Sequence, residues 1–228
     1  MIKEVMVIKK YKYFKICILA FFLFIFSFIV LFFKWKTEYT VHFLKYEDDK
    51  FDIQYPQLKF VFDKKEEKKI NQLIYEHMKG PLGSNPNMCI GLRAEIMYQD
   101  DHFVSIYYKG FSYDQSGWGF SNYGFAINID ISNNQIVPIS YLINEKDFNQ
   151  LKEQIANKDF VVKFGYRNIE NNDEYKLNKE IPDINDVHSY YIKDGFIGII
   201  INGFDEEDGN FIKLEIPYNT QLIRAYKT

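Results

Sequence analysis

The segment IGLRAEIMYQDDHFVSIYYKGF, residues 90–111, decides the fold that the sequence predicts. Its first half alternates between apolar and polar side chains, and the side chains expected on one face of a strand are Leu92, Ala94, Ile96 and Tyr98. The alternation breaks at residues 99–101, and a second apolar stretch follows from Phe103 to Phe111. Two such stretches around a short polar break predict an antiparallel β-hairpin.

Upstream of this hairpin, the pattern predicts two strands and one helix. Apolar stretches at residues 39–44 and 51–55 indicate strands, the second ended by Pro56. Asp63 is a predicted N-cap, and Glu66 follows three residues later, as in a capping box. The next residues place apolar side chains on one face of an amphipathic helix that ends at Gly80.

Downstream, the pattern predicts more strands and a second helix. A strand is expected at residues 123–131, and a helix at 142–156 with a new first turn near Asn144. A closing meander is expected between residues 189 and 216. The predicted fold class is α+β, an antiparallel sheet with two main helices, preceded by one N-terminal transmembrane helix.

The transmembrane prediction rests on an apolar run of eighteen residues from Ile16 to Phe33. A helix of that length covers roughly 27 Å, close to the ~30 Å hydrocarbon core of a bilayer. Five lysines precede the run against one acid, which indicates a cytoplasmic amino terminus. A cleaved signal peptide is the alternative, but the run is longer than a typical h-region and no small-residue cleavage site follows it.

The expected organisation therefore has three parts. Residues 1–15 form a cytoplasmic tail, and residues 16–35 form a transmembrane anchor, with 16–33 inside the membrane. Residues 37–228 form an extracytoplasmic module with a candidate internal boundary near residues 80–90. The expected location is a bacterial cell membrane, crossed once, with the carboxyl-terminal domain outside.

Charge separates the two ends of the chain. Residues 37–228 carry 21 lysines and arginines against 30 aspartates and glutamates, a formal net charge of −9. A nucleic-acid partner requires a basic surface, so none is expected, whereas a cationic protein is favoured. Cys89 is the one cysteine in this region, so its stability must come from a hydrophobic core and not from internal disulfides.

The order of elements resembles a family of bacterial extracytoplasmic domains of unknown function. The similarity covers about residues 50–225, and its motifs are Tyr55-Pro56, Ile70-Asn71 on the first helix, Phe103-Val104-Ser105-Ile106, Asn128-Ile129-Asp130 with Ile139 to Leu142, and Ile216-Pro217-Tyr218. Such domains occur in the ectodomains of lysozyme-sensing membrane anti-sigma factors and ahead of the catalytic domain in some peptidoglycan deacetylases. The resemblance implies a role at the cell wall.

Two activities of those relatives are not expected here. The anti-sigma relatives carry a folded cytoplasmic segment, whereas about fifteen residues precede the apolar run in this chain, too few to bury a core. The deacetylase relatives carry a catalytic domain after the module, and this sequence has none. Sigma-factor binding and deacetylation are therefore not carried over.

The best candidate binding residues are aromatic. The segment from Phe111 to Tyr123 is interpreted as a loop in which flanking glycines let Trp118 project, and its other candidates are Tyr113, Phe120 and Tyr123. A glycan or a protein partner would stack on such side chains, although they could also pack beneath a long hairpin. Asn128 and Asp130 share a face of a predicted strand, where they would bind sugar hydroxyls or a cation. The alternative, which such pairs show more often, is that they bond the turn at 132–135.

No catalytic, cofactor or metal signature accompanies these residues. The four histidines are scattered without paired spacing, and no nucleophile-elbow sequence surrounds a serine. The hypothesis is a membrane-tethered, non-enzymatic module that binds or senses a cell-wall component, such as peptidoglycan, or a cell-wall-directed protein such as lysozyme. The alternatives are a cell-wall hydrolase using acids such as Asp130 and Glu95, and a structural partner of a membrane complex.

Overall fold

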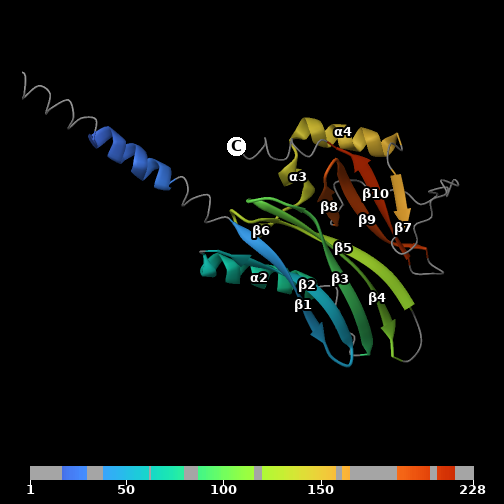
Figure 1. Cartoon of the computed structure of the whole chain (residues 1–228). Helices are drawn as coiled ribbons and strands as arrows, with labels where there is room; N and C mark the ends of the chain where they lie inside the picture. The colour runs from blue at the N-terminus through green and yellow to red at the C-terminus, as the bar shows by residue number, and fades with distance from the viewer. Residues whose placement is uncertain are drawn as a thin grey trace, which may run out of the picture.

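The hairpin of residues 90–111 is the centre of the larger of two β-sheets in the computed structural model (Figure 1). The structure describes residues 17–29, 38–61, 63–79, 87–115, 120–157, 161–164, 189–205 and 210–218. Six strands form this sheet in the order β1-β2-β3-β4-β5-β6, with bounds Tyr39–Glu47, Phe51–Phe60, Met88–Gln99, Phe103–Asp114, Phe120–Asp130 and Gln135–Ile136. The predicted hairpin corresponds to β3 and β4, which pair antiparallel.

A β-bulge in β3 places Tyr98 on the face of the sheet opposite to the predicted one. Ile96 pairs with Ile106, but Tyr98 pairs with Ser105, so one extra residue lies between them on β3. Leu92 and Ile96 therefore pack against the core beneath the sheet, whereas Tyr98 packs against Phe103 on the other side. The prediction that Tyr98 shares a face with Leu92 was wrong because the bulge reverses the alternation.

Strand β2 departs from the prediction in two ways. It runs parallel to β3 over Phe51–Ile53, so the sheet is not purely antiparallel. It also continues through Pro56 to Phe60. The backbone N–H groups of Leu58 and Phe60 point away from β1, toward side chains of the following helix. Residue 56 has the same orientation in the strand, and no described strand pairs with β2 on that side there, so a residue without an N–H is tolerated.

Helix α2 (Lys64–Lys79) covers one face of this sheet, as Figure 1 shows. The predicted cap is confirmed, since the Glu66 N–H donates to Asp63 Oδ1 at 3.0 Å. The Glu66 carboxylate accepts from Asn134 of the β5–β6 turn, which joins the start of the helix to the sheet. The apolar side of α2 contributes Ile70, Ile74 and Met78 to the core, all nearly inaccessible to solvent.

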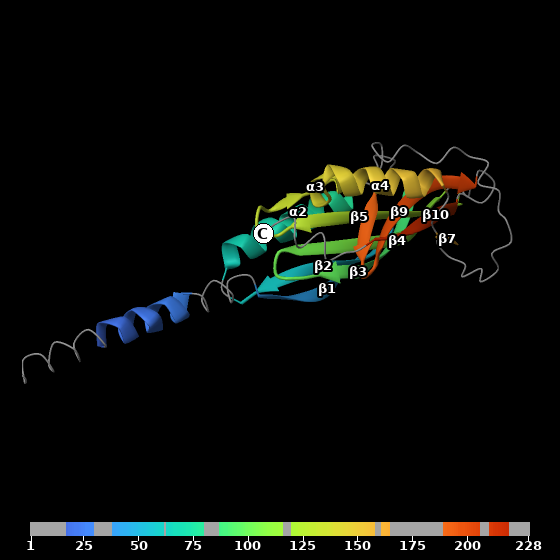
Figure 2. The ribbon, with the colours of Figure 1, turned by 90° about the horizontal axis from the view of Figure 1, so that it is seen from above.

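A second sheet of four strands packs on the other face of the first. Its order is β7-β10-β9-β8, with bounds Val161–Phe164, Asn210–Pro217, Phe196–Asp205 and Tyr190–Lys193. Helices α3 (Ile139–Leu142) and α4 (Glu145–Ala156) cover its far side. The new first turn predicted near Asn144 is the start of α4, which the Asn144 side chain caps. The layers are thus helix, six-stranded sheet, four-stranded sheet and helix (Figure 1), and in the view of Figure 2 the N-terminal helix lies well away from all of them. The α+β class is confirmed, and the single predicted sheet is two sheets.

The N-terminal helix, residues 17–29, exposes apolar side chains on all sides and stands apart from the sheets in Figure 1. Phe21, Phe24 and Phe26 are each more than 60 % exposed. Within the described residues, no helix has both the length and the apolar character needed to span a bilayer. The predicted cytoplasmic tail, residues 1–15, lies outside the described part of the chain.

Candidate functional site

Three aromatic side chains form a patch at the end of the β4–β5 hairpin. Phe111 and Tyr113 are two residues apart on β4, and Tyr113 pairs with Phe120 on β5, so all three side chains lie on one face of the sheet. The Phe111 ring lies 6.4 Å from Tyr113 and 5.9 Å from Phe120, with interplanar angles of 17° and 16°. Tyr113 is 42 % exposed and Phe120 is 57 % exposed. We call these three residues the aromatic patch.

Gly91 allows the patch to lie flat on the sheet. It pairs with Phe111 across β3 and β4. A Cβ atom at position 91 would lie only 2.5 Å from Cζ of Phe111, so the phenyl ring occupies the space above the glycine. Cys89, the next residue on this face of β3, is buried beside Tyr113.

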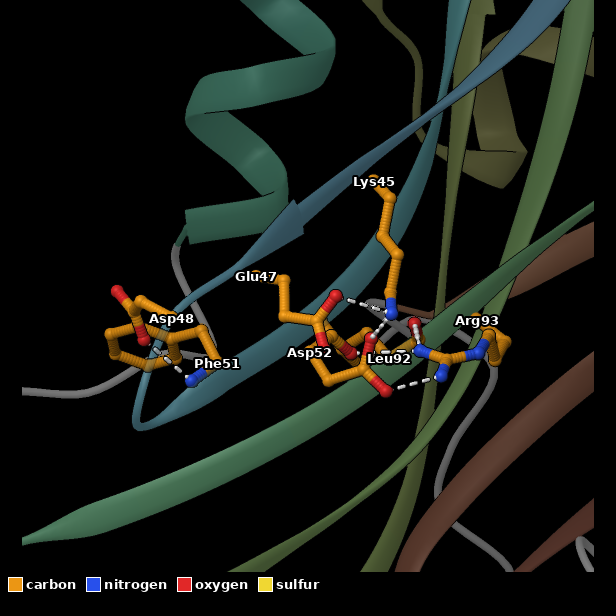
Figure 3. Close-up of polar contacts among 7 residues, drawn as sticks. All are labelled: Lys45, Glu47, Asp48, Phe51, Asp52, Leu92 and Arg93. Atoms are coloured by element: carbon orange, nitrogen blue, oxygen red, sulfur yellow. Dashed lines mark hydrogen bonds and ion pairs between the residues drawn. The ribbon is translucent and has the colours of Figure 1, made fainter.

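The strands next to the aromatic patch carry charged side chains, whose contacts with one another are drawn in Figure 3. Asp52 of β2 pairs with Gly91, and its carboxylate accepts from Arg93 at 2.5 Å. Arg93 also donates to the Asp52 backbone carbonyl at 2.8 Å. Lys45 of β1 lies 3.3 Å from Asp52 and 2.6 Å from Glu47. The sheet face beside the patch is therefore lined by two cations and two anions.

The ion pairs keep this border charged over a wide pH range. The Arg93 guanidinium, followed by the Lys45 ammonium, holds the pKa of Asp52 below its usual range. Hydrogen bonds to Glu47 and then to Asp52 raise the pKa of Lys45. These groups are largely exposed, so the pairs contribute little to stability. Their donors and acceptors lie at the surface, where a polar ligand can reach them.

The structure separates the predicted aromatic residues. Tyr113 and Phe120 lie together in the patch, but Tyr123 pairs with Gly110 on the opposite face and packs against the core below α2. Trp118 lies outside the described residues. Phe111 was interpreted as the end of the predicted strand and the start of the loop, and not as a binding residue. The alternation with Tyr113 within a continuing strand was the signal that could have added it to the set.

Asn128 lies well away from the patch and joins the two sheets. It is 1 % exposed, and its Nδ2 donates to the Tyr190 carbonyl of β8 at 2.5 Å. Its partner across the hairpin, Ser105, accepts from the Ile192 N–H of β8 at 2.9 Å. The two side chains thus satisfy backbone groups at the edge of β8, as a neighbouring strand would.

Asp130 bonds the turn that follows β5. It is also 1 % exposed, and its Oδ1 accepts from the backbone N–H groups of Ser132 and Asn133 at 3.0 and 3.2 Å. Its Oδ2 accepts from the side chains of Asn133 and Tyr141. These contacts correspond to the alternative considered for Asp130 in the sequence, a turn-stabilising carboxylate.

The described residues offer little for catalysis. His102 Nδ1 lies 3.0 Å from Ser132 Oγ on exposed turns, but Asp100 accepts from the backbone N–H of His102 and not from its imidazole. Glu95 is exposed on β3, whereas Asp130 is buried in its turn. Within the described ranges, no three His, Cys, Asp or Glu side chains gather in a way that could hold a metal ion. The arrangement suits binding through stacking and hydrogen bonds.

Known proteins match this chain by structure. The sequence matches no family model and no curated protein. The fold is similar to that of a DUF3298 family member from Bacteroides fragilis NCTC 9343, with a TM-score of 0.53, 12 % identity, and coverage of 84 % of this chain and 98 % of that chain. A DUF3298 family protein from Pseudomonas aeruginosa PAO1 also matches, with a TM-score of 0.44, 12 % identity, and coverage of 81 % and 93 %.

The similarity to the Bacteroides protein shows the fold, which is that of a bacterial domain of unknown function. This agrees with the resemblance seen in the sequence at that level. The link to lysozyme-sensing anti-sigma factors and to peptidoglycan deacetylases stays a prediction.

Proposed function

We propose that this chain is a non-enzymatic binding module of the bacterial cell envelope and that the aromatic patch contacts its ligand. The stacked rings of half-buried Phe111 and exposed Tyr113 and Phe120 carry this proposal. Large apolar side chains gathered at a surface usually mark an interaction site. Aromatic residues supply much of the energy at such sites because they bury a large area with few rotatable bonds.

A glycan strand of the cell wall suits this surface. The three rings lie within 17° of parallel in the two ring pairs that they form, so they offer a flat apolar area for the carbon–hydrogen faces of sugar rings. The charged border supplies donors from Arg93 and acceptors from Asp52 for hydroxyl and amide groups. Peptidoglycan is accordingly the first ligand to test.

A cationic protein such as lysozyme is the second candidate. Residues 37–228 have a formal charge of −9, which would steer a basic partner toward the module. That attraction would be spread over the surface, and it would weaken as salt is added. Salt dependence therefore separates this candidate from stacking on the aromatic patch.

The location outside the membrane is part of the same proposal. It is supported by the apolar run of residues 16–33, by the lysines that precede it, and by the apolar side chains that the helix of residues 17–29 exposes on all sides. A helix that is apolar all round is normally buried in a protein or a membrane. Membrane fractionation of cells that produce the chain, with alkaline washing, tests this part.

The binding test compares the wild-type chain with a Tyr113→Ala/Phe120→Ala double variant. The full-length protein in detergent is mixed with purified insoluble peptidoglycan, and the bound fraction is measured by sedimentation. The double variant is expected to bind at least about tenfold more weakly, since removing a central aromatic contact costs ~1–2 kcal/mol or more. Val61→Ala, at an apolar position that is 51 % exposed outside the patch, is the matched control.

The same protein is then tested with lysozyme across a salt series. Binding that disappears with added salt and is unaffected by the double variant would favour the cationic protein. If the wild type bound neither partner at low salt, the binding proposal would be wrong. Release of soluble fragments from peptidoglycan would contradict the non-enzymatic reading.

A further inference from the structure

The outer edge of β1 differs from the other sheet edges among the described residues. The two sheets end in β1 and β6, and in β7 and β8. Strand β1 has nine residues, whereas β6 has two and both β7 and β8 have four. A long edge strand is a template for pairing with another chain, and proteins usually shorten or cover such edges.

Side chains cover two of the other edge segments, β8 and the part of β2 that extends beyond β3. Ser105 and Asn128 bond the backbone of β8, as described above. Where β2 extends beyond β3, Asn71 of α2 accepts from the Leu58 N–H at 2.8 Å and donates to the Leu58 carbonyl at 2.9 Å. On the described part of the chain, the edge of β1 has no comparable cover.

The direction of the free backbone groups on β1 follows from its partner. Because both backbone groups of Leu58 point at Asn71, Leu58 and its partner Val41 form a non-hydrogen-bonded pair. The N–H and carbonyl of Val41 therefore point away from β2. Alternate residues share this orientation, so the outward backbone groups on β1 belong to Tyr39, Val41, Phe43, Lys45 and Glu47.

Apolar side chains on both faces of β1 accompany this free edge. Phe43, Leu44 and Tyr46 are 44 %, 42 % and 43 % exposed. The strand contains no proline, and none of its pairs with β2 is shifted by a bulge, so two of the usual devices against edge pairing are missing from it. Its one lysine, Lys45, is held in ion pairs with Glu47 and Asp52.

We propose that β1 pairs antiparallel with β1 of a second copy of this chain, about a twofold axis at Phe43. Phe43 is the middle residue of the strand, so this register uses all nine residues of each copy. This register also places the outward backbone N–H and carbonyl groups of one β1 strand opposite those of the other. The opposed pairs, each with the second residue in the other copy, are Phe43 with Phe43, His42 with Leu44, Val41 with Lys45, Thr40 with Tyr46, and Tyr39 with Glu47.

The side chains favour a second copy in this register. No two like charges oppose each other, because Lys45 faces Val41 and Glu47 faces Tyr39. Two phenyl rings meet at the axis, where an aromatic pair is stabilising. The pairing would join two six-stranded sheets into one continuous sheet and would satisfy the outward groups of both edges.

Cysteine cross-linking of the full-length chain tests this register. In a Cys17→Ser background, Phe43→Cys places two thiols across a hydrogen-bonded pair, with Cα atoms about 5.5 Å apart. Glu47→Cys is the matched control, because its two copies would lie about 27 Å apart, eight residues along the strand. Two differently tagged chains are co-produced, extracted in detergent, treated with a short bifunctional maleimide and examined on a denaturing gel.

The expected result is an adduct of twice 27.3 kDa that carries both tags, abundant for Phe43→Cys and absent for Glu47→Cys alone. Mixing Tyr39→Cys chains with Glu47→Cys chains should restore it. Cys89 is buried, so its lack of reaction with maleimide verifies that each variant is folded. An absent adduct at position 43 in folded protein, or one of another mass with a single tag, would overturn the proposal.

A second variant tests the same pairing without cysteine chemistry. Phe43→Lys places two ammonium groups opposite each other and should lower the dimer fraction measured by sedimentation. Val61→Lys, at an exposed position just after β2, should leave it unchanged. An undiminished dimer in Phe43→Lys would count against β1 as the interface. Neither experiment depends on the ligand of the aromatic patch.

Discussion

Replacing Gly198 with alanine should destabilise this protein strongly, although alanine is normally the better residue within a strand. Gly198 of β9 lies between Tyr191 of β8 and Glu215 of β10 in register. The Tyr191 ring crosses over the glycine, and its hydroxyl donates to Glu215 Oε1 at 2.7 Å. A Cβ atom at position 198 would lie 2.0 Å from Cζ of Tyr191, far inside a normal carbon contact of about 3.5 Å.

Two opposing effects decide the stability of Gly198→Ala: the lower backbone entropy of alanine in the unfolded chain, and the clash of the added Cβ with the Tyr191 ring. Alanine gains roughly 0.5–1 kcal/mol over glycine from reduced backbone entropy. Against this, moving a fully buried ring in a packed core costs about 1–3 kcal/mol. Losing the hydrogen bond to a charged acceptor costs about 1.5–3 kcal/mol more, because Glu215 is 4 % exposed. The ring cannot move freely, since it also packs against Tyr107 at 5.5 Å. The expected loss is about 2–5 kcal/mol.

Urea unfolding followed by tryptophan fluorescence and circular dichroism measures this loss in the full-length chain. Gly195→Ala is the control, because it has a positive φ of 80° but nothing within 4 Å of the added Cβ, so it should cost only the backbone strain of about 1–2 kcal/mol. In a Tyr191→Leu background, Gly198→Ala should cost much less, because the ring that it strikes is gone. A Gly198→Ala variant as stable as the wild type would refute the reasoning.

Three further predictions concern the cap, the patch and the charged border. Asp63→Ala should lower the Tm by about 2–4 °C in calorimetry, since losing an N-cap costs ~1 kcal/mol, and an unchanged Tm would show that the cap is dispensable. Gly91→Ala should displace the Phe111 ring by about 1 Å and weaken peptidoglycan binding while the Tm changes little. Binding as strong as that of the wild type would argue against the patch as the ligand site. Because the pKa of Asp52 is lowered in the folded protein, the wild type should be slightly more stable than Asp52→Asn above pH 3.8. This difference, measured as Tm against pH, should shrink as the pH falls below 3.8. A difference that does not depend on pH would contradict this prediction.

Local patterns in the sequence predicted local structure well. The alternation around residues 90–111 predicted the central hairpin, and the residues at Asp63 and Asn144 predicted the starts of two helices. Each of these depends on neighbours a few positions away, whose chemistry can be read directly. The division between two sheets could not be predicted in this way, because apolar strands with the same alternation suit either sheet.

Contacts between distant residues accounted for the errors. The bulge before Tyr98 adds one residue without any compositional signal. The parallel pairing of β2 with β3 requires the chain to cross back along α2, and nothing within either strand indicates it. For the candidate site, the aromatic residues were found by type, but their faces depend on how far β4 and β5 extend. Because both strands extend to the end of the hairpin, Tyr113 lies opposite Phe120 on one face of the sheet, and Tyr123 lies on the other face.

The direction of β1 determines how this protein would carry a mechanical load. Tyr39 begins the strand beside the β3–β4 turn, where its hydroxyl donates to the Asp100 carbonyl, and Glu47 ends it toward the aromatic patch. A pull between the N-terminal side of the chain and a ligand on the patch would thus act along the strands. Its nine residue pairs with β2 would be strained together in shear and would not open one after another. A module held by one end and gripping a rigid polymer by the other would resist extension through this strand pair.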